Sequence, residues 1–198
     1  MKFLPLIALA CLLSHPVLCG ADAAPAAPAL EATPGMKRAR NKLKRDFQLP
    51  FRKADERQRI TAFTPEYVIK EITTNKDFRS LFQVRFWCGE NQARIIPALI
   101  GLLSSKKTVG LTDSADVIIW KRIQSGDLKF SGHGWVIADD LFTASGRSSW
   151  LLKDITGEAH GTIKMGSTDK DRRAVQQKWQ EWLRKHSVKA EPRPAENP

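Results

Sequence analysis

Residues 94–103 read Arg-Ile-Ile-Pro-Ala-Leu-Ile-Gly-Leu-Leu, and they form the most apolar stretch that follows the N-terminal segment. The apolar side chains recur three and four positions apart, which places them on one wide face of a helix. Pro97 falls near the start of this helix, where a proline is tolerated. Because so wide an apolar face must be covered by other elements, the stretch predicts a helix inside a helical core.

The flanking segments carry the same helical period. Thr64 and Pro65 supply an N-cap and a first helical position. Thr168 and Asp171 have the spacing of a capping box at the start of the last helix. The sequence therefore predicts an all-α domain of about six helices in a compact array. One expected helix begins at residue 65, and the others cover residues 77–86, 95–103, 112–125, 139–155 (broken at 145–146) and 168–186. Ahead of them, residues 37–48 can also be helical, until Pro50 stops the helix.

The N-terminal segment predicts export. Lys2 is followed by an apolar run from Phe3 to Leu13 and then by small residues, which is typical of a secretory signal peptide over residues 1–23. The run is too short to span a membrane. Cys19 raises the alternative of a lipid anchor, but Leu18 stands where such signals usually have a small residue. We therefore expect a free periplasmic or secreted protein.

The positive charge of the chain is concentrated in one segment. The formal net charge is +11, and residues 37–59 hold ten Lys or Arg against three Asp or Glu. We expect an Ala/Pro linker over 24–36, a flexible basic arm over 37–59, a helical domain over 60–186 and a disordered tail over 187–198. Such an arm can hold an anionic polymer or membrane surface, or it can be a solvated leader. Its candidate binding residues are Arg38, Arg40, Lys42, Lys44 and Arg45.

Two glycine-flanked histidines are the candidates for chemistry. His133 lies between Gly132 and Gly134, and Asp139 and Asp140 follow it, so the carboxylates can orient the imidazole or join it as ligands. His160 could meet His133 in a shared metal site. The alternative is a turn histidine with an aspartate that caps the next helix.

Cysteine and tryptophan positions indicate packing more than chemistry. Cys88 is the one cysteine outside the predicted signal peptide, and it predicts an isolated buried thiol. Trp120, Trp150, Trp179 and Trp182 lie on apolar helical faces and are expected in the core. Trp87 and Trp135 adjoin glycines outside those faces and are the predicted exposed binding pair.

Three stretches suggest a family. Residues 94–103 look like the second helix of a HEAT-type repeat, and residues 146–157 are similar to a later repeat helix. Residues 155–161 with 179–182 resemble the closing unit of some bacterial HEAT-repeat proteins, in which a Thr-Gly turn and a tryptophan-rich helix cap the stack. The resemblance, to an exported HEAT/armadillo-like protein over about 60–186, implies a binding module. No fixed period repeats cleanly, and residues 127–138 insert a glycine-rich excursion.

The sequence thus predicts an exported protein-binding or scaffolding module whose partner is another exported or envelope protein. One alternative is a small exported hydrolase or metal-dependent enzyme built on His133, Asp139, Asp140 and His160. Another is a binder of anionic polymer or membrane through residues 37–59, with genomic DNA not expected as a partner. No nucleophile elbow, phosphate-binding loop or paired-cysteine motif occurs, so no cofactor is expected.

Overall fold

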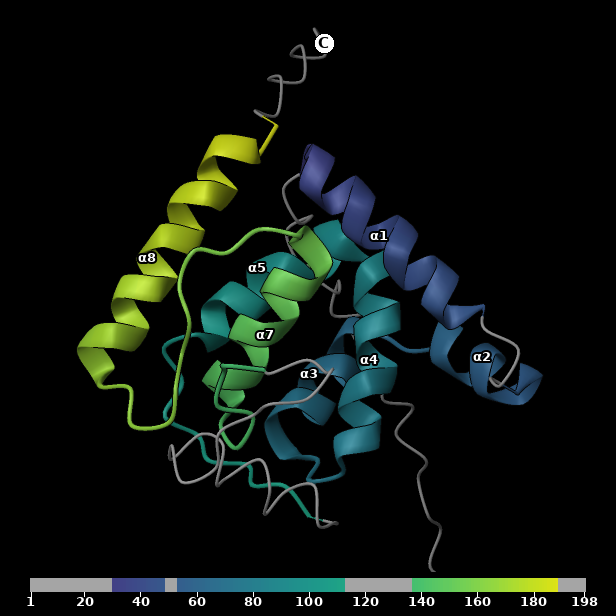
Figure 1. Ribbon diagram of the computed structural model, residues 1–198, viewed down its shortest axis with the longest axis horizontal. Coiled ribbons are helices and arrows are strands. Elements are labelled where there is room, and N and C mark those ends of the chain that lie inside the picture. The colour runs from purple at the N-terminus through teal and green to yellow at the C-terminus, as the bar shows by residue number, and fades with distance from the viewer. Residues whose placement is uncertain (1–29, 49–52, 113–136, 189–198) are drawn as a thin grey trace, which may run out of the picture.

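The computed structural model describes residues 30–48, 53–112 and 137–188. Within these ranges the secondary structure is helical, with isolated bridges and no strand, so the all-α prediction is confirmed. The helices of the described residues are α1 (Pro34–Phe47), α2 (Ala54–Thr61), α3 (Pro65–Thr74), α4 (Phe78–Glu90), α5 (Gln92–Leu102), α7 (Ala144–Thr156) and α8 (Asp169–His186) (Figure 1).

Threonine N-caps fix the start of four helices. The hydroxyl of Thr64 accepts a hydrogen bond from a backbone N–H of the first turn of α3, as the sequence predicts. Thr168 and Asp171 form the predicted reciprocal capping box of α8. Thr33 and Thr143 cap α1 and α7 in the same way. Each cap satisfies amide groups that the first turn of a helix leaves without an intrahelical partner.

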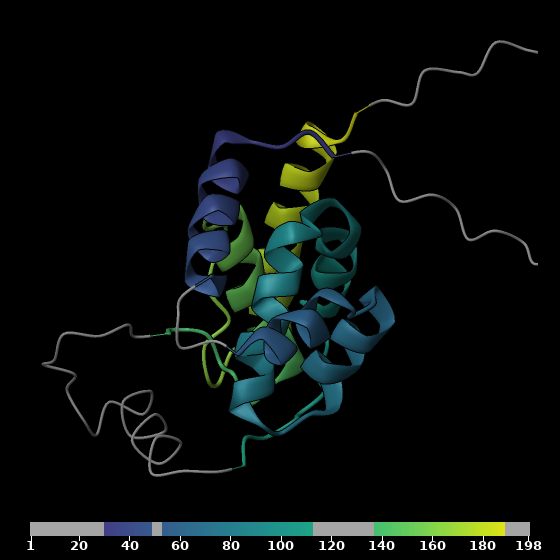
Figure 2. The same ribbon diagram turned by 90° about the vertical axis from the view of Figure 1, so that its right-hand side faces the viewer.

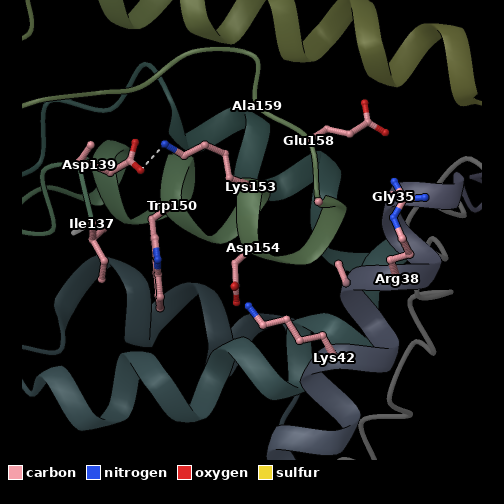
Figure 3. A pocket seen from close by; sticks show the side chains of 13 residues that line it. Gly35, Arg38, Lys42, Ile137, Asp139, Trp150, Lys153, Asp154, Glu158 and Ala159 are labelled. Atoms are coloured by element: carbon pink, nitrogen blue, oxygen red, sulfur yellow. Dashed lines mark ion pairs between the residues drawn. The ribbon is translucent and has the colours of Figure 1, made fainter. Parts of the chain in front are cut away.

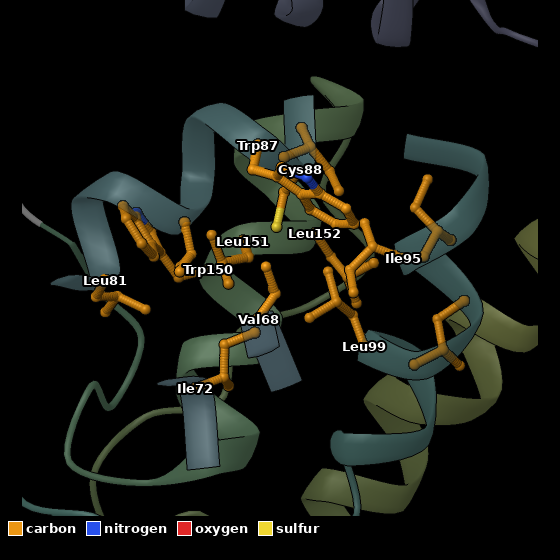
Figure 4. Packing of buried hydrophobic residues seen from close by; sticks show 14 of the residues in the cluster. Val68, Ile72, Leu81, Trp87, Cys88, Ile95, Leu99, Trp150, Leu151 and Leu152 are labelled. Atoms are coloured by element: carbon orange, nitrogen blue, oxygen red, sulfur yellow. The ribbon is translucent and has the colours of Figure 1, made fainter. Parts of the chain in front are cut away.

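Helix α7 is the centre of the fold, and α1, α3, α4 and α5 pack around it (Figure 1). Almost all of its side chains are buried, including the polar side chains of its first two turns. Figure 4 shows Leu151 and Leu152 of α7 beside Cys88 of α4 and Leu99 of α5. The stripe of residues 95–103 therefore lies against α7, which explains why it is so apolar.

The predicted helix over 139–155 begins later than expected and is not broken at Ser145–Gly146. Residues 139–143 form turns, and α7 runs without interruption from Ala144 to Thr156. The interruption was inferred from the low helix propensity of serine and glycine. Tertiary packing overrides that preference here, because both residues are buried against the preceding turn. Gly157 ends the helix in the left-handed conformation with φ 69°, as expected.

Residues 37–47 are helical, as the sequence allows, but this part of the predicted arm packs on the core and is not a flexible segment. Helix α1 buries Met36, Ala39 and Leu43 against α4 and α7, and Gln92 of α5 donates a hydrogen bond to the Met36 carbonyl oxygen. Its apolar stripe is interleaved with so many cations that composition alone suggested a solvated segment. Helix α2 begins within the predicted arm at Ala54 and ends at Thr61 in the predicted helical domain, where Ile60 is buried.

The segments before α1 and after α8 lie side by side. The backbone N–H of Glu31 donates to the carbonyl oxygen of His186, and Leu30 forms an antiparallel bridge with Ser187. Figure 2 shows the segment before α1 crossing to the C-terminal end of α8. Leu30 and Glu31 are therefore paired and residues 34–36 are helical where a linker was predicted, and the predicted tail begins with a paired residue.

A buried arginine joins four segments around the start of α7. The Arg147 side chain is 1% exposed, and its nitrogens donate to the carbonyl oxygens of Ile72 (3.2 Å), Asn75 (2.6 Å), Gly110 (2.7 Å) and Leu141 (2.7 Å). Burial lowers the pKa of Arg147 to about 10, so the guanidinium stays charged at neutral pH. It therefore neutralises the carbonyl end of α3 while it holds two loops against α7.

Several predictions concern residues outside the described ranges: the signal peptide, the helix after Thr112, Trp120, His133 and Trp135. In the described residues, no helix combines the length and the apolar character needed to cross a membrane. The HEAT-like relationship also stays a prediction, because an all-α architecture does not by itself show a repeat.

The Cys88 thiol is fully buried among apolar side chains, as the sequence predicts (Figure 4). Burial is the main cause that raises the pKa of Cys88 far above its usual range, so little thiolate forms at neutral pH.

We expect Cys88 to react with an aromatic disulfide reagent about a hundredfold more slowly in the folded protein than in urea, because reaction requires local unfolding. The measurement uses a chain in which Cys11 and Cys19 are replaced by serine, so that one thiol is counted. Equal rates in buffer and in urea would contradict the buried placement.

Candidate functional site

The outer face of α1 carries exposed cations on a rigid support. Lys37, Arg38, Lys44 and Arg45 are exposed, while the opposite face of the helix is buried in the core. Lys37 and Lys44 are seven residues apart, as are Arg38 and Arg45, so each pair repeats on the same side of the helix after two turns. The predicted binding residues thus form an ordered surface instead of a flexible arm.

Two other predicted cations of α1 have roles within the protein. The Arg40 guanidinium bonds to the Glu90 carboxylate at 3.1 Å and to the Glu90 carbonyl oxygen at 3.2 Å, which joins α1 to the end of α4. Lys42 lines a pocket beside α7, and Figure 3 shows its side chain directed toward Asp154. Asp46, the one acidic residue of α1, lies 3.8 Å from Arg85.

A pocket of about 540 Å³ lies between α1 and α7 (Figure 3). Its volume is within the usual range of small-molecule sites. Ala39, Ile137, Trp150 and Ala159 provide apolar walls. The polar side chains that line it are Arg38, Lys42, Asp139, Lys153, Asp154 and Glu158.

Asp139 lines this pocket, but its carboxylate is fully engaged. The side chain is 1% exposed and pairs with the Lys153 ammonium group at 2.5 Å (Figure 3). It also accepts hydrogen bonds from the Ser149 hydroxyl at 2.7 Å and from the Ile163 backbone N–H at 3.2 Å. Asp139 therefore fastens its segment to α7, which is a different role from the predicted catalytic one.

Asp140 forms the turn that leads into α7. Its carboxylate accepts from the Phe142 backbone N–H at 3.1 Å, and its carbonyl oxygen accepts from the Thr143 hydroxyl at 3.1 Å. Burial raises the pKa of Asp140, and the hydrogen bonds to its carboxylate oppose that effect. The alternative interpretation of a helix-capping aspartate is close to this arrangement, although Thr143 is the N-cap.

The two other carboxylates of the pocket are also paired. Asp154 accepts from the Arg85 guanidinium at 2.9 Å. Glu158 accepts from the Thr33 hydroxyl at 3.0 Å and from the Trp182 indole N–H at 2.7 Å. The bonds of Glu158 tie the start of α1 and the end of α8 to the turn that follows α7, and the bond of Asp154 ties α4 to α7.

His160 packs among aromatic rings. Its ring lies edge-on to Trp179, with the centroids 4.6 Å apart, and its Nε2 lies 3.3 Å from the Glu158 carboxylate. Among the described residues, no group of three or more His, Cys, Asp or Glu is placed to hold a metal ion. The predicted site shared with His133 stays a prediction, since His133 is outside the described ranges.

The prediction that Trp87 is exposed is wrong. Its side chain is 4% exposed and lies in the apolar core (Figure 4). Gly89 suggested a loop, but α4 continues through it to Glu90. The glycine instead allows Leu43 of α1 to approach, since a Cβ at position 89 would lie 2.7 Å from Leu43 Cδ1. Trp150, Trp179 and Trp182 are buried, as predicted.

No family model, no curated protein and no solved structure matches this chain. Three further residues line the pocket with the predicted Arg38 and Lys42 and were not predicted from the sequence: Lys153, Asp154 and Glu158. A signal for them existed, because Lys153 and Asp154 interrupt an otherwise buried helix and so need partners or a solvent-facing cavity.

Proposed function

We propose that this protein is a binding module, exported as its N-terminal segment predicts, that recognises an acidic segment of a protein partner. The outer face of α1 is the proposed contact surface. The observation that carries the proposal is the ordered row of exposed cations Lys37, Lys44 and Arg45 on a helix whose other face is anchored in the core. Fixed cations bind acidic groups at a smaller entropic cost than a flexible arm does.

A protein partner is favoured over a membrane surface by the placement of apolar side chains. Helices that lie on membranes insert an apolar face below the headgroups. The apolar face of α1 is instead buried against α4 and α7. The large apolar side chains exposed among the described residues are Tyr67, Met165 and Val188, and none of them is on α1.

Replacing Lys37, Lys44 and Arg45 with glutamine is expected to weaken binding of a fluorescein-labelled oligoglutamate peptide about tenfold or more, as measured by fluorescence anisotropy. The matched control replaces Lys70, Arg79 and Arg173, which are exposed on other helices, and removes the same charge. The control should change the affinity about threefold or less, since charges beyond a Debye length are screened.

The salt dependence gives a second readout. Binding to the oligoglutamate peptide should weaken as salt rises from about 0.05 to 0.5 M, because the contacts are exposed ion pairs. Equal losses in the α1 and control variants would contradict the proposal and leave only a general charge effect. Tight binding to anionic vesicles without binding to the peptide would favour the membrane alternative.

A further inference from the structure

The pocket between α1 and α7 is lined by three carboxylates, Asp139, Asp154 and Glu158, and by three basic side chains, Arg38, Lys42 and Lys153. Each carboxylate that lines it has partners: Asp139 pairs with Lys153, Asp154 with Arg85, and Glu158 accepts from Thr33 and Trp182. The negative charges of the pocket are therefore stabilised by donors within the fold.

Arg38 differs from these side chains. It lines the pocket from α1, is exposed, and makes no hydrogen bond or ion pair with any residue that the structure describes. Figure 3 shows its guanidinium on the α1 side of the pocket, with Lys42 further along the same helix. Arginine is the side chain best suited to a carboxylate, because its parallel N–H groups match the two oxygens.

The walls determine what must be attached to such an anion. Trp150 and Ile137 lie next to each other on the wall opposite Arg38 (Figure 3). Ala39 and Ala159 keep the side walls small and apolar. A ligand that is only charged would leave these surfaces wet, whereas an aromatic or branched body would cover them and gain hydrophobic free energy.

We infer that this pocket is a binding site for a small organic carboxylate with an apolar, ring-sized body. Its carboxylate pairs with Arg38 and its body packs against Trp150 and Ile137. This inference does not depend on the function proposed for the outer face of α1, because Lys37, Lys44 and Arg45 do not line the pocket.

The test uses 2-naphthoate as the probe and 2-naphthamide as its uncharged counterpart, with affinities measured by isothermal titration calorimetry at neutral pH. We expect 2-naphthoate to bind the full chain with a submillimolar dissociation constant. The dissociation constant of 2-naphthamide should be at least about tenfold higher. Equal affinities for the two compounds, or no heat from naphthoate at millimolar concentration, would overturn the inference.

Matched variants locate the site. Arg38→Gln should weaken naphthoate binding about tenfold, whereas Arg45→Gln removes an exposed charge from the same helix outside the pocket and should leave the affinity unchanged. Ala159→Trp, at an exposed position of the pocket wall, should abolish binding by filling the space. If Arg38→Gln and Arg45→Gln bind equally well, naphthoate sits elsewhere and the inference is wrong.

One further variant separates this inference from the proposed function. The Lys37, Lys44 and Arg45 triple variant retains every residue that lines the pocket. It should bind oligoglutamate about tenfold or more weakly and keep its affinity for naphthoate. A parallel loss of naphthoate binding in this variant would show that the outer face holds the probe, and that result would overturn the pocket.

Discussion

Replacing Arg147 with methionine is expected to lower the free energy of unfolding by about 3–5 kcal/mol. The guanidinium is buried and donates to carbonyl oxygens from α3, the segment after α5, and the turn before α7. Methionine has a similar length but no donor, so these oxygens would lose their partners. A buried acceptor without a partner costs about 1–3 kcal/mol. The Ile72 and Asn75 oxygens suffer most, because they lie at the negative end of the α3 dipole.

The measurement is urea unfolding followed by circular dichroism, with Arg173→Met as the matched control. Arg173 is exposed on α8, and its replacement should change stability by no more than about 0.5 kcal/mol. Arg147→Lys should fall between the two, because an ammonium group keeps the charge but cannot reach all four oxygens. If Arg147→Met is as stable as the unaltered protein, the carbonyl network contributes no net stability.

How far the sequence predicts this fold depends on the kind of signal. The helices that begin at Thr64 and Thr168 were located correctly because caps are local and depend on side chains within four residues. The start of α7 was not located, because residues 139–143 form turns instead of helix and Asp140 lies against Gly146. A local propensity cannot anticipate a tertiary contact of this kind.

The placement of α1 shows a second limit. Its buried residues, Met36, Ala39 and Leu43, have helical spacing and are visible in the sequence. The surrounding positive charge suggested solvent exposure on every side, although a charged helix needs only a narrow apolar stripe to pack. The prediction for Trp87 failed for a different reason, because Gly89 suggested a loop where α4 continues and Trp87 is buried.

The candidate site was predictable only in part, because it depends on a contact between helices that are far apart in the sequence. Arg38 and Lys42 were selected by charge, and the structure places both at the pocket. Trp150 was correctly expected to be buried, yet one edge of it forms a pocket wall. The pocket exists because α1 crosses α7, a contact between residues more than 100 positions apart, and no local pattern encodes that distance.

Gly146→Ala is expected to lower the free energy of unfolding by roughly 2 kcal/mol or more, even though alanine is the better helix former. An added Cβ would lie 2.0 Å from the carbonyl oxygen of Asp140. That oxygen cannot move freely, because it accepts from the Thr143 backbone N–H and hydroxyl while the Asp140 N–H donates to Ile163 at 2.7 Å. Relief of the clash would therefore pull the start of α7 away from the turn that Thr143 and Asp140 build.

Gly101→Ala provides a control of opposite sign. Gly101 is exposed in α5, and a Cβ there would meet no atom within 4 Å. The gain in helix propensity should then raise the free energy of unfolding by about 0.5 kcal/mol. Urea midpoints of both variants test the close approach directly, because propensity predicts that both changes stabilise. A midpoint for Gly146→Ala at or above that of the unaltered protein would show that the turn before α7 can yield, and that the start of this helix is not fixed by its contact with Asp140.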